Sequence, residues 1–561
     1  MTLLPAYDIT LAGYAGLAAI VAIGLTLLTG VSGQTSFGQA SFVGIAAYAA
    51  ALLPDGPSGL LAGLALTGAA AWLLGLITAR LSGHFLALCS VAWGISFYAL
   101  FGTLPLLHGF NGIGGIPPLR LGPLSLAAPA ANVALIWLVV GLALLASRNL
   151  LTSRTGRAMR TLAGARAMAE SMGIDTVRLA RAVFVLAALL AAVSGFLFAH
   201  FQRFISPTPF SLTASIEYLF MVILGGAAHL GGAVLGAVLV TVLREELTDW
   251  VPRLTGATGN YEAMAFSLAV ILFLQRAPRG LWPRLARRAA RPKPRRAAPA
   301  QPARECPIAD GVALEIEGLR KHFGGLAANQ DVSFSIRTGE IVALIGPNGA
   351  GKSTLFDIVS GQLAPTAGTV RLFGRAVVRL PARRIAALGL ARTFQHVKLL
   401  ADESVRDNIA LGAHLAGRAG MLRALLRLDR AEEARLLAAA EAAAARVGLD
   451  DMLDMKAGAL PLGRQRIVEI ARALCLAPRL LLLDEPAAGL RLQEKQQLAA
   501  LLRQLRGEGM AVLLVEHDMG FVMDLADRVV VMDFGQKIAE GAPAVVQADP
   551  AVLEAYLGGV A

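Results

Sequence analysis

The chain has 561 residues, a formal net charge of +12 and a hydrophobic content of 56%. One hydrophobic core rarely serves so long a chain, so two or more domains are expected. Three cysteines, Cys89, Cys306 and Cys475, lie far apart without metal-ligand spacing, which argues against a disulfide or zinc framework. Many arginines flank apolar runs or lie in one Arg/Pro segment, a distribution that argues against nucleic acid as a partner.

The first half of the chain has the composition of a membrane protein. Residues 1 to about 285 are rich in Ala, Leu, Val and Gly and carry few charges. Apolar runs, most of them near the ~20 residues that cross a bilayer, lie at 11–30, 36–53, 60–79, 85–104, 130–147, 180–200, 216–243 and 261–275. The pattern predicts a polytopic all-α membrane domain.

Basic residues predict the orientation of these spans. Arg80 follows the third run, and seven arginines lie between the fifth and sixth runs: Arg148, Arg154, Arg157, Arg160, Arg166, Arg178 and Arg181. The positive-inside rule places both loops in the cytoplasm. Asp8, Asp55 and the Pro/Gly-rich segment 105–129 then face the other side.

The run 216–243 must cross the membrane twice or form a re-entrant pair. The soluble half carries the phosphate-binding motif described below, which requires the cytosol, and a single span here would leave it outside. The run is interrupted by GGAAHLGG, Gly225 to Gly232. This break predicts either a discontinuous helix near a substrate path or close helix packing through small residues.

Several polar residues in the membrane half have two readings. Gln34, Thr35, Ser36 and Gln39 could face a pathway or join helices by hydrogen bonds. Glu217 is either a functional carboxylate or an interfacial residue. Four histidines near predicted span ends are expected to be interfacial: His84, His108, His200 and His229.

Two basic segments follow the fifth and eighth runs. Residues 148–179 have helix-forming composition and end in a glycine stop at Gly173. This region could dock on a cytoplasmic partner domain or lie on anionic lipid. Residues 276–306 are rich in Arg, Pro and Ala without a hydrophobic period, which predicts a disordered or extended tether at the inner leaflet.

The soluble half is organised around GPNGAGKST, Gly346 to Thr354. An apolar β-type run, 340–345, precedes the motif, and the start of a helix, 355–359, follows it. A glycine-rich turn between a strand and a helix directs backbone N–H groups at phosphate oxygens. Lys352 could then reach the β- and γ-phosphates, and Ser353 could ligate Mg²⁺. The predicted ATP-binding residues here are Gly346, Pro347, Asn348, Gly349, Ala350, Gly351, Lys352, Ser353 and Thr354.

The remaining parts of an ATPase follow in order. Phe323, expected in the loop after the first strand, could stack on adenine, or it could belong to the core. Gln395 could bring an amide oxygen to Mg²⁺. Asp484, at a strand end beside the phosphate loop, could hold Mg²⁺ through water, and Glu485 could polarise the attacking water. His517 could contact the γ-phosphate and orient that water.

The stretch ALPLGRQRIVEIARAL, 459–474, opens a further helix. Its N-terminus could bind a phosphate across a dimer interface. An Ala-rich, charged helical region, about 405–447, precedes it.

With these motifs in place, residues 312–561 resemble an ATP-binding cassette (ABC) protein. The resemblance assigns Walker A to Gly346–Ser353, the Q-loop to Gln395, Walker B to Asp484, the catalytic base to Glu485 and the switch histidine to His517. It assigns the signature to Leu460, Pro461, Leu462, Gly463, Arg464 and Gln465.

The resemblance extends to the branched-chain amino-acid (Liv-type) importers. LLLLDEPAAGL, LLVEHDM and EGAPAVVQADPAVLEAYLGG are similar to the ATPase of those systems, and SGQTSFGQASFVGIAAY, GFNGIGGIPPL and APRGLW are similar to their permease. The implied fold is a polytopic all-α membrane domain followed by an α/β P-loop NTPase. The implied division is a permease at 1–283, an Arg/Pro/Ala-rich linker at 284–311 and an ABC ATPase at 312–561.

The signature departs from the family's usual LSGGQ. Pro461 removes a serine hydroxyl and an N–H that could touch the γ-phosphate, and Arg464 replaces glutamine. The segment AAGLR also lacks the aspartate usual in the D-loop. Since each ATP lies between one subunit's Walker A and the other's signature, the change would weaken the partner's ATP site.

The resemblance implies half of an ATP-driven importer of branched-chain or other hydrophobic amino acids in the bacterial inner membrane, with its ATPase domain cytoplasmic. The expected cofactors are ATP and Mg²⁺. The expected partners are a second permease, a second ATPase, a periplasmic solute-binding protein, the solute and membrane lipid. Uptake of urea, short amides or aromatic acids is the alternative; an exporter and a regulatory ATPase are further from the pattern.

Overall fold

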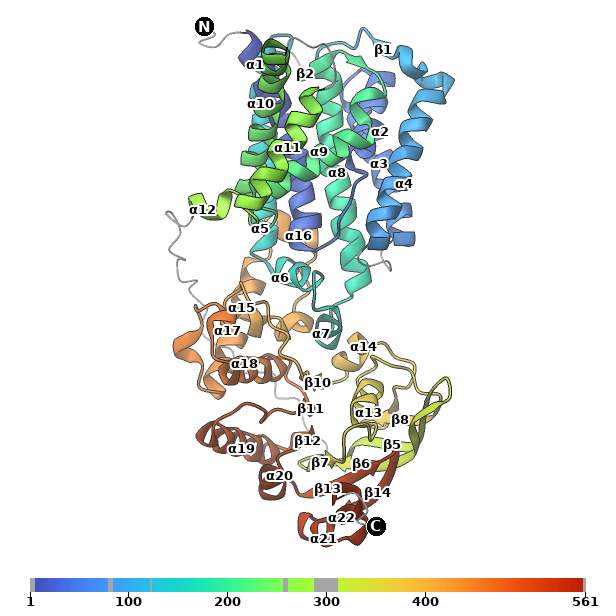
Figure 1. Ribbon diagram of the computed structural model, residues 1–561, viewed down its shortest axis with the longest axis vertical. Coiled ribbons are helices and arrows are strands. Elements are labelled where there is room, and N and C mark those ends of the chain that lie inside the picture. Colours follow the sequence, from blue (N-terminus) through green and yellow to red (C-terminus); the bar gives the residue numbers. More distant parts are fainter. Residues whose placement is uncertain (1–5, 79–83, 122–123, 256–260, 287–310, 558–561) are drawn as a thin grey trace. The chain divides into compact units, whose positions relative to one another are not determined.

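The computed structural model describes residues 6–78, 84–121, 124–255, 261–286 and 311–557 (Figure 1). Contacts group the chain into two compact units. The first comprises 1–164, 177–293 and 421–428, and the second comprises 165–176, 294–420 and 429–561. Each unit therefore includes one short segment from the other half of the sequence, and each is described by itself below.

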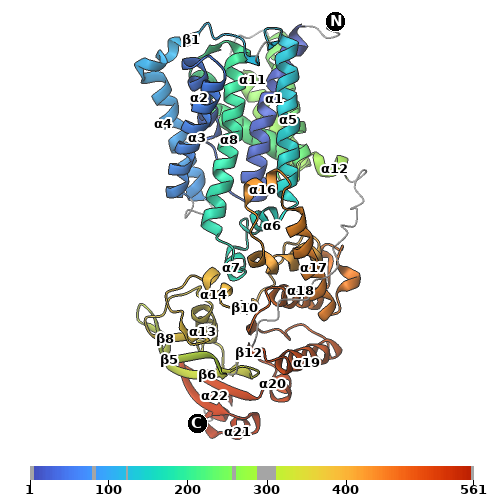
Figure 2. The same ribbon diagram turned by 180° about the vertical axis from the view of Figure 1, so that it is seen from behind.

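The first unit is a helical bundle with small two-stranded pairings at one end (Figures 1 and 2). Among the described residues, five helices are long and apolar enough to cross a membrane. Its helices are α1 (Ala6–Leu25), α2 (Gln39–Leu52), α3 (Pro57–Thr78), α4 (His84–Thr103), α5 (Pro129–Leu151), α6 (Arg154–Thr161), α8 (Thr176–Gln202), α9 (Leu212–Gly225), α10 (Leu230–Thr255), α11 (Tyr261–Arg276), α12 (Trp282–Ala286) and α16 (Met421–Leu425). Its strands are β1 (Ile113–Gly114), β2 (Arg120–Leu121), β3 (Leu124–Ser125) and β4 (Phe204–Ile205).

The run 216–243 is two helices, as the sequence predicted. α9 ends at Gly225, and α10 begins at Leu230 after a turn in which Gly226 has a φ of 117°. Small residues also hold the pair together, because a Cβ on Gly236 would lie 1.8 Å from the carbonyl oxygen of Met221. Close packing through small residues, one of the two interpretations of this break, is therefore present.

A second discontinuity lies between α1 and α2. α1 passes into a π-helical turn, η1 (Thr26–Val31), and residues 33–38 are not helical. A Cβ on Gly30 would lie 1.6 Å from the carbonyl oxygen of Ala227, so only glycine permits this approach. The two interrupted segments of the bundle are therefore in direct contact.

The polar side chains near this break join helices by hydrogen bonds. The buried Gln34 amide donates to Ser32 Oγ at 2.8 Å and to the carbonyl oxygen of Ala180 at 3.3 Å. The backbone N–H of Ala40 donates to Ser215 Oγ at 3.1 Å. The interhelical reading of this segment is the one that these bonds support.

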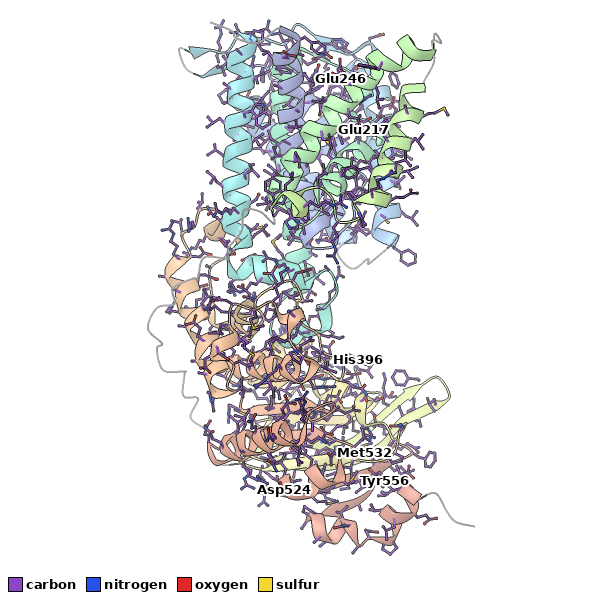
Figure 3. The ribbon with its side chains drawn as sticks, turned by 60° about the vertical axis from the view of Figure 1, so that its left-hand side comes forward. Glu217, Glu246, His396, Asp524, Met532 and Tyr556 are labelled. Carbon is purple, nitrogen blue, oxygen red and sulfur yellow. The ribbon has the colours of Figure 1, made fainter. Side chains whose placement is uncertain are left out.

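Glu217 forms an ion pair with Arg244, its Oε2 lying 2.7 Å from the Arg244 Nη1 (Figure 3). The pair joins α9 to α10. His200, near the end of α8, is buried, and its Nδ1 lies 2.9 Å from the carbonyl oxygen of Pro117. Both groups therefore have structural partners within the first unit.

The predicted extended tether begins later than the sequence suggested. Residues 282–286 form α12, and the Leu281 N–H donates to the carbonyl oxygen of Leu224 at 3.0 Å. A Cβ on Gly231 would meet the Trp282 ring at 2.2 Å, so the indole lies against a glycine surface. This packing makes the prediction wrong for 281–286, and the rest of the Arg/Pro segment, 287–310, lies outside the described residues.

The second unit is built on two sheets (Figure 1). A six-stranded sheet has the order β10-β11-β12-β7-β13-β14, and a four-stranded antiparallel sheet has the order β6-β5-β8-β9. The strands are β5 (Val312–Phe323), β6 (Leu326–Arg337), β7 (Ile341–Ile345), β8 (Ala367–Leu372), β9 (Arg375–Ala376), β10 (Leu390–Arg392), β11 (Leu480–Asp484), β12 (Ala511–Val515), β13 (Arg528–Asp533) and β14 (Gln536–Gly541).

The helices of this unit are α7 (Arg166–Ser171), α13 (Lys352–Val359), α14 (Ala382–Ala387), α15 (Val405–Ala410), α17 (Arg430–Arg446), α18 (Leu462–Cys475), α19 (Leu492–Gly507), α20 (Met519–Leu525), α21 (Pro543–Gln547) and α22 (Pro550–Leu557). β7, β11 and β12 are buried along their whole length, which explains their continuous apolar sequences.

The sheet order determines which loops meet. β7, β12 and β11 are parallel, so the loops after Ile345, Val515 and Asp484 leave the same edge. β12 lies between the other two, and the phosphate loop is therefore one strand removed from Asp484. The sequence predicted Asp484 at a strand end beside that loop; the strand order, which local pattern does not reveal, adds β12 between them.

Candidate functional site

The phosphate-loop motif forms the turn between β7 and α13. Gly349 and Gly351 have φ of 85° and 93°, a region in which side chains are strained. A Cβ on Gly351 would lie 2.2 Å from the carbonyl oxygen of Ala328, and one on Gly346 would lie 2.0 Å from that of Met532. Glycine is required by both conformation and space at 346 and 351, and by conformation alone at 349.

Lys352 lies within this loop. Its Nζ donates to the carbonyl oxygens of Gly346 and Pro347 at 2.6 and 2.9 Å. Burial lowers the pKa of this lysine, and the nearby carboxylates of Glu485 and Asp484 oppose that shift. The ammonium group is thus held where a phosphate would replace the two carbonyl oxygens as its partner.

Glu485 is the centre of the polar contacts in the site. Its Oε1 accepts a hydrogen bond from the Gln395 amide at 3.0 Å and lies 3.2 Å from His517 Nε2. Its backbone has a φ of 48°, which is uncommon for a residue other than glycine. Gln395 and His517, which the sequence predicted separately, thus both contact the carboxylate of Glu485. The residue with the strained backbone is Glu485 itself.

Asp484 is buried at the end of β11. Its Oδ2 lies 3.6 Å from Nη2 of Arg392, and burial raises its pKa in spite of this arginine. Arg392 is itself buried and also donates to Asp357 Oδ1 at 2.6 Å and to Ser360 Oγ at 2.7 Å. The sequence analysis missed Arg392, although an arginine ending an apolar strand is a signal for a buried charge.

A cavity of about 310 Å³ joins the phosphate loop to Gln395, Glu485 and His517, and neither Asp484 nor Arg392 lines it. Its lining residues are Phe323, Leu326, Ala327, Ala328, Asn348, Gly349, Ala350, Gly351, Lys352, Ser353, Thr354, Gln395, Glu485, Val515 and His517. Phe323 is the last residue of β5 rather than a loop residue, and its half-exposed ring forms one wall. The cavity offers backbone N–H groups, a lysine, a carboxylate and an aromatic face together, which suits a nucleoside triphosphate.

The residues of the predicted signature lie outside this cavity. Pro461 is the N-cap of α18, and Gln465 donates its side-chain amide to the carbonyl oxygen of Leu460 at 2.8 Å. Arg464 lines a second cavity of about 330 Å³ with Arg446 and Glu494. None of Leu460, Pro461, Leu462, Gly463, Arg464 and Gln465 lines the first cavity, so within one chain the signature does not meet the phosphate loop.

α18 contacts the segment that begins at Gln395 through three charged side chains, which lie three residues apart along the helix. Arg466 Nη2 donates to the carbonyl oxygen of Gln395 at 3.1 Å, and Arg472 Nη1 donates to that of Lys398 at 2.8 Å. Glu469 Oε1 accepts from the Lys398 N–H and from Arg472 Nη2, both at 2.9 Å. Glu469 and Arg472 are fully buried, and the sequence analysis missed them; the signal was an i, i+3, i+6 charge pattern inside an amphipathic helix.

The C-terminal helix also reaches the phosphate loop. The hydroxyl of Tyr556, on α22, has a hydrogen bond with the backbone of Gly346. Burial raises the pKa of Tyr556, and this bond opposes the shift. The contact joins residues that are far apart in sequence, so no local motif predicted it.

Comparison with known families covers both halves of the chain. The model for the branched-chain amino acid transport system permease component matches residues 9–275, and the ABC transporter model matches 329–488. The model for the branched-chain amino acid ATP-binding cassette transporter matches 536–561, which includes Tyr556.

Individual relatives agree. The high-affinity branched-chain amino acid transport ATP-binding protein LivG of Salmonella typhimurium is 41% identical over 248 residues, which are 44% of this chain and 97% of LivG. The chain belongs to the branched-chain amino-acid ABC transporter family. BraF of Pseudomonas aeruginosa, a protein of the same description, is 40% identical over 44% of this chain and 97% of its own.

A solved nucleotide-free ATP-binding cassette from an ABC transporter is 31% identical and covers 44% of this chain and all of that chain, with a TM-score of 0.41. Membership of the family confirms the predicted fold class, a helical membrane domain followed by an α/β ABC ATPase. In this ABC transporter a permease and an ATP-hydrolysing cassette occupy one chain.

Proposed function

We propose that this chain is half of an ATP-driven importer of branched-chain or other hydrophobic amino acids in the bacterial inner membrane, with the cassette in the cytoplasm. The observation that carries the proposal is the union, in one chain, of this permease with a cassette whose Gln395, Glu485 and His517 converge at one oxygen. The named relatives supply the solute class.

In the proposed mechanism Phe323 stacks on adenine and Gly346 to Thr354 bind the phosphates. Lys352 exchanges its two carbonyl partners for phosphate oxygens, a substitution that its present position allows. Glu485 takes the proton of the attacking water, and His517 orients that water toward the γ-phosphate.

The residues near the phosphate loop fit Mg²⁺. Ser353, Gln395 and Asp484 offer hydroxyl, amide and carboxylate oxygens, the donor types that Mg²⁺ prefers. When bound, the cation neutralises charge on the phosphates. It would also compensate the buried Asp484 carboxylate, whose pKa is raised by burial.

The proposed assembly has two permeases, two ATPases and a periplasmic solute-binding protein. The signature residues Leu460 to Gln465 lie away from this chain's own cavity, as expected if they complete the ATP site of a second ATPase. The proposed division of the chain is 1–283 for the permease, 284–311 for the linker, whose first three residues form the end of α12, and 312–561 for the ATPase.

Alternating access requires a bundle with a movable element near the solute. The contact between the interrupted segments at Gly30 and Ala227 supports a path at this place, because irregular backbone inside a membrane is tolerated where it lines a cavity or is covered by protein. α7, which groups with the cassette residues, is proposed to carry closure of the cassettes to the bundle.

The test is ATP hydrolysis by the chain with its co-expressed partners in lipid nanodiscs. The binding protein is added empty or loaded with leucine, urea or benzoate, and Glu485→Gln serves as the inactive control. We expect stimulation by the leucine-loaded protein and a loss of hydrolysis of about 10²–10⁴-fold in the variant. Stimulation only by the urea-loaded or benzoate-loaded protein would mean that the proposed solute is wrong. High ATP hydrolysis that no binding protein changes would contradict the proposed import function.

A further inference from the structure

One segment of the cassette sequence, 421–428, belongs by its contacts to the helical bundle. Ala424 is buried in the hydrophobic core of that bundle, with Met421 and Leu425 packed against the same core. The Asn149 amide, near the end of α5, donates to the carbonyl oxygen of Leu425 at 3.1 Å. Figures 1 and 2 both place α16 at this end of α5.

The rest of the segment exposes apolar surface. Leu422, Leu426 and Leu428 are exposed by 76%, 70% and 70%. Arg423 and Arg427 alternate with them and are exposed as well. Three large, exposed leucines in eight residues form a patch that water covers poorly, and interleaved arginines are the composition of an interfacial membrane segment.

The leucine patch continues a stripe on α5. Leu138, Leu142 and Leu145 lie on one face of that helix and are exposed by 60%, 56% and 57%. Only 28% of the apolar window of α5 is buried within the bundle, so this face is the one that meets lipid. Following α5 toward Leu151, the face reaches Arg148 and Asn149, where the 421–428 segment docks.

We infer that residues 421–428 are an interfacial membrane anchor of the cassette. Leu422, Leu426 and Leu428 enter the boundary between headgroups and acyl chains on the cassette side of the membrane. Arg148, Arg423 and Arg427 face the anionic phosphates of the headgroups there. This surface goes beyond the proposed transport function and requires neither the solute nor ATP hydrolysis.

The position of this segment gives the anchor a consequence. Asp429 and Arg430 follow it directly and return the chain to the cassette at α17. The anchor is thus joined to the cassette sequence with no intervening linker. The charge of the lipid then becomes a variable that acts on the transporter directly.

The experiment uses the full chain with its partners, with Cys89, Cys306 and Cys475 replaced by alanine. A fluorophore is attached to Leu422→Cys, and the nanodiscs contain phosphatidylglycerol and phosphatidylcholine with a shallow nitroxide-labelled lipid as quencher. Leu492→Cys is the matched control, because Leu492 is 73% exposed on the cassette helix α19. Leu145→Cys is the reference for a side chain that faces lipid.

We expect the nitroxide lipid to quench the Leu422→Cys probe about three times more strongly than the Leu492→Cys probe, since an interfacial segment lies within ~5–10 Å of the headgroup boundary. Equal quenching of the two probes would overturn the anchor. Protection of the Leu422→Cys probe from both the lipid quencher and aqueous iodide would also overturn it, because a protein would then cover the leucines.

The arginines are tested separately. Replacing Arg423 and Arg427 by glutamine should reduce the gain in quenching that phosphatidylglycerol gives over pure phosphatidylcholine. Circular dichroism and basal ATP hydrolysis check that this variant is folded. An unchanged preference for anionic lipid would contradict the role assigned to these two side chains.

Discussion

Asp484 is buried at the end of β11 with its Oδ2 3.6 Å from Arg392 Nη2, and burial disfavours its charged form. Burial raises its pKa from the ordinary 3.8. An acid whose pKa is higher in the folded state than in the unfolded state binds more protons when folded. Its contribution to stability is therefore lost as pH rises from 3.8 through the folded pKa.

Asp484→Asn should consequently stabilise the nucleotide-free cassette at pH 7 by about 1 kcal/mol, or about 2–4 °C in Tm. Arg392 retains Asp357 as a partner in this variant. The gain should shrink as the pH approaches 3.8, and stabilisation by MgATP should be lost. Calorimetry at several pH values with and without MgATP measures both effects; a lower Tm at pH 7 would contradict the argument.

At the scale of elements, α18 and the segment after Gln395 are joined by a network of charged hydrogen bonds. Glu469 lies between the Lys398 N–H and Arg472, and the Glu469 and Arg472 side chains are buried. Removing one charge of a buried pair leaves the other uncompensated. The pair holds the segment after Gln395 against the helix that begins at the predicted signature.

Glu469→Gln preserves shape but removes charge. We expect the cassette to lose about 2 kcal/mol of stability, the value of a charge-assisted hydrogen bond. The stimulation of ATP hydrolysis by loaded binding protein should fall more than basal hydrolysis does, because Gln395 remains at the site but its link to α18 is weaker. Glu508→Gln, at the surface pair with Arg446, is the control. Equal losses of basal and stimulated activity would indicate a purely structural role.

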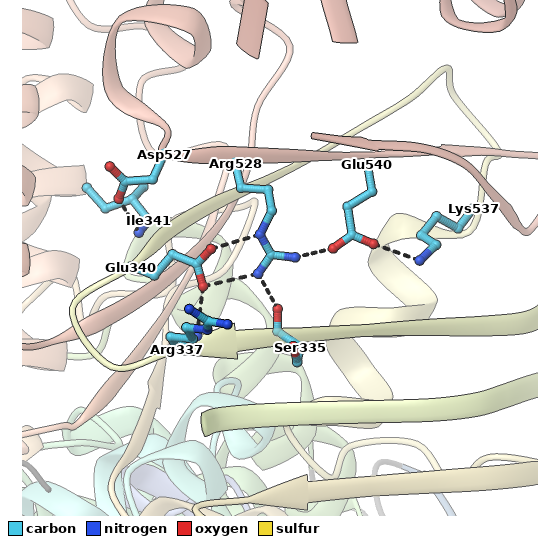
Figure 4. Close-up of polar contacts among 8 residues, drawn as sticks. All are labelled: Ser335, Arg337, Glu340, Ile341, Asp527, Arg528, Lys537 and Glu540. Carbon is cyan, nitrogen blue, oxygen red and sulfur yellow. Dashed lines mark hydrogen bonds and ion pairs between the residues drawn. The ribbon is translucent and has the colours of Figure 1, made fainter. Parts of the chain in front are cut away.

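A second network of polar contacts, centred on Arg528, joins strands of the six-stranded sheet to β6 of the four-stranded sheet (Figure 4). Arg528, on β13, donates Nε to Glu340 Oε1 at 2.8 Å and Nη2 to Glu340 Oε2 at 3.1 Å. It also donates to the carbonyl oxygen of Ser335 and to Glu540. The hydrogen bond to Glu340 is the main reason that the pKa of Arg528 is raised. β6, β7, β13 and β14 meet at this guanidinium group.

Arg528→Lys should destabilise the cassette by about 1–3 kcal/mol, because lysine offers no bidentate fork. Arg503→Lys is the matched control: its pair with Asp524 is more exposed and should contribute at most about 0.5 kcal/mol. Calorimetry of the cassette unfolding transition compares the two. Equal losses of stability in the two variants would mean that the contacts of Arg528 with several strands contribute no additional stability.

At the scale of the whole molecule, the two units exchange short segments. Residues 165–176 group with the cassette, where the Gln362 amide donates to the carbonyl oxygen of Ala167 at 3.1 Å and Arg383 pairs with Asp175 at 3.3 Å. Gly173 has a φ of 83°, and a Cβ there would lie 2.4 Å from the Leu415 side chain. The glycine therefore determines how closely α7 docks.

Gly173→Ala should reduce solute-stimulated hydrolysis and transport about tenfold, since an alanine at positive φ costs about 1 kcal/mol and displaces Leu415. Basal hydrolysis should remain. Gly164→Ala, in the same region with no atom near its Cβ position, should have no effect. Adding Leu415→Ala to Gly173→Ala should restore part of the coupling; no recovery would show that the contact is not the cause.

The sequence identified most of the residues that line the candidate ATP cavity because their chemistry is local. Gly346 to Thr354 form a turn whose function depends on consecutive residues, and Asp484, Glu485 and His517 each end an apolar strand. Parallel strands bring such ends to one edge whatever their order. The doubling of 216–243 followed from the same kind of constraint, since a chain must cross a bilayer a whole number of times.

The tertiary structure alone decided which distant groups share a partner. Such contacts join residues from separate elements, and no period or spacing in one segment encodes them. They are the contacts of Arg392 with Asp484, of Glu469 and Arg472 with Lys398, and of Tyr556 with Gly346. The exchange of 165–176 and 421–428 is of the same kind. Local sequence specifies what a segment is able to do, whereas burial against a particular neighbour, set by the packing of the whole chain, specifies where it does so.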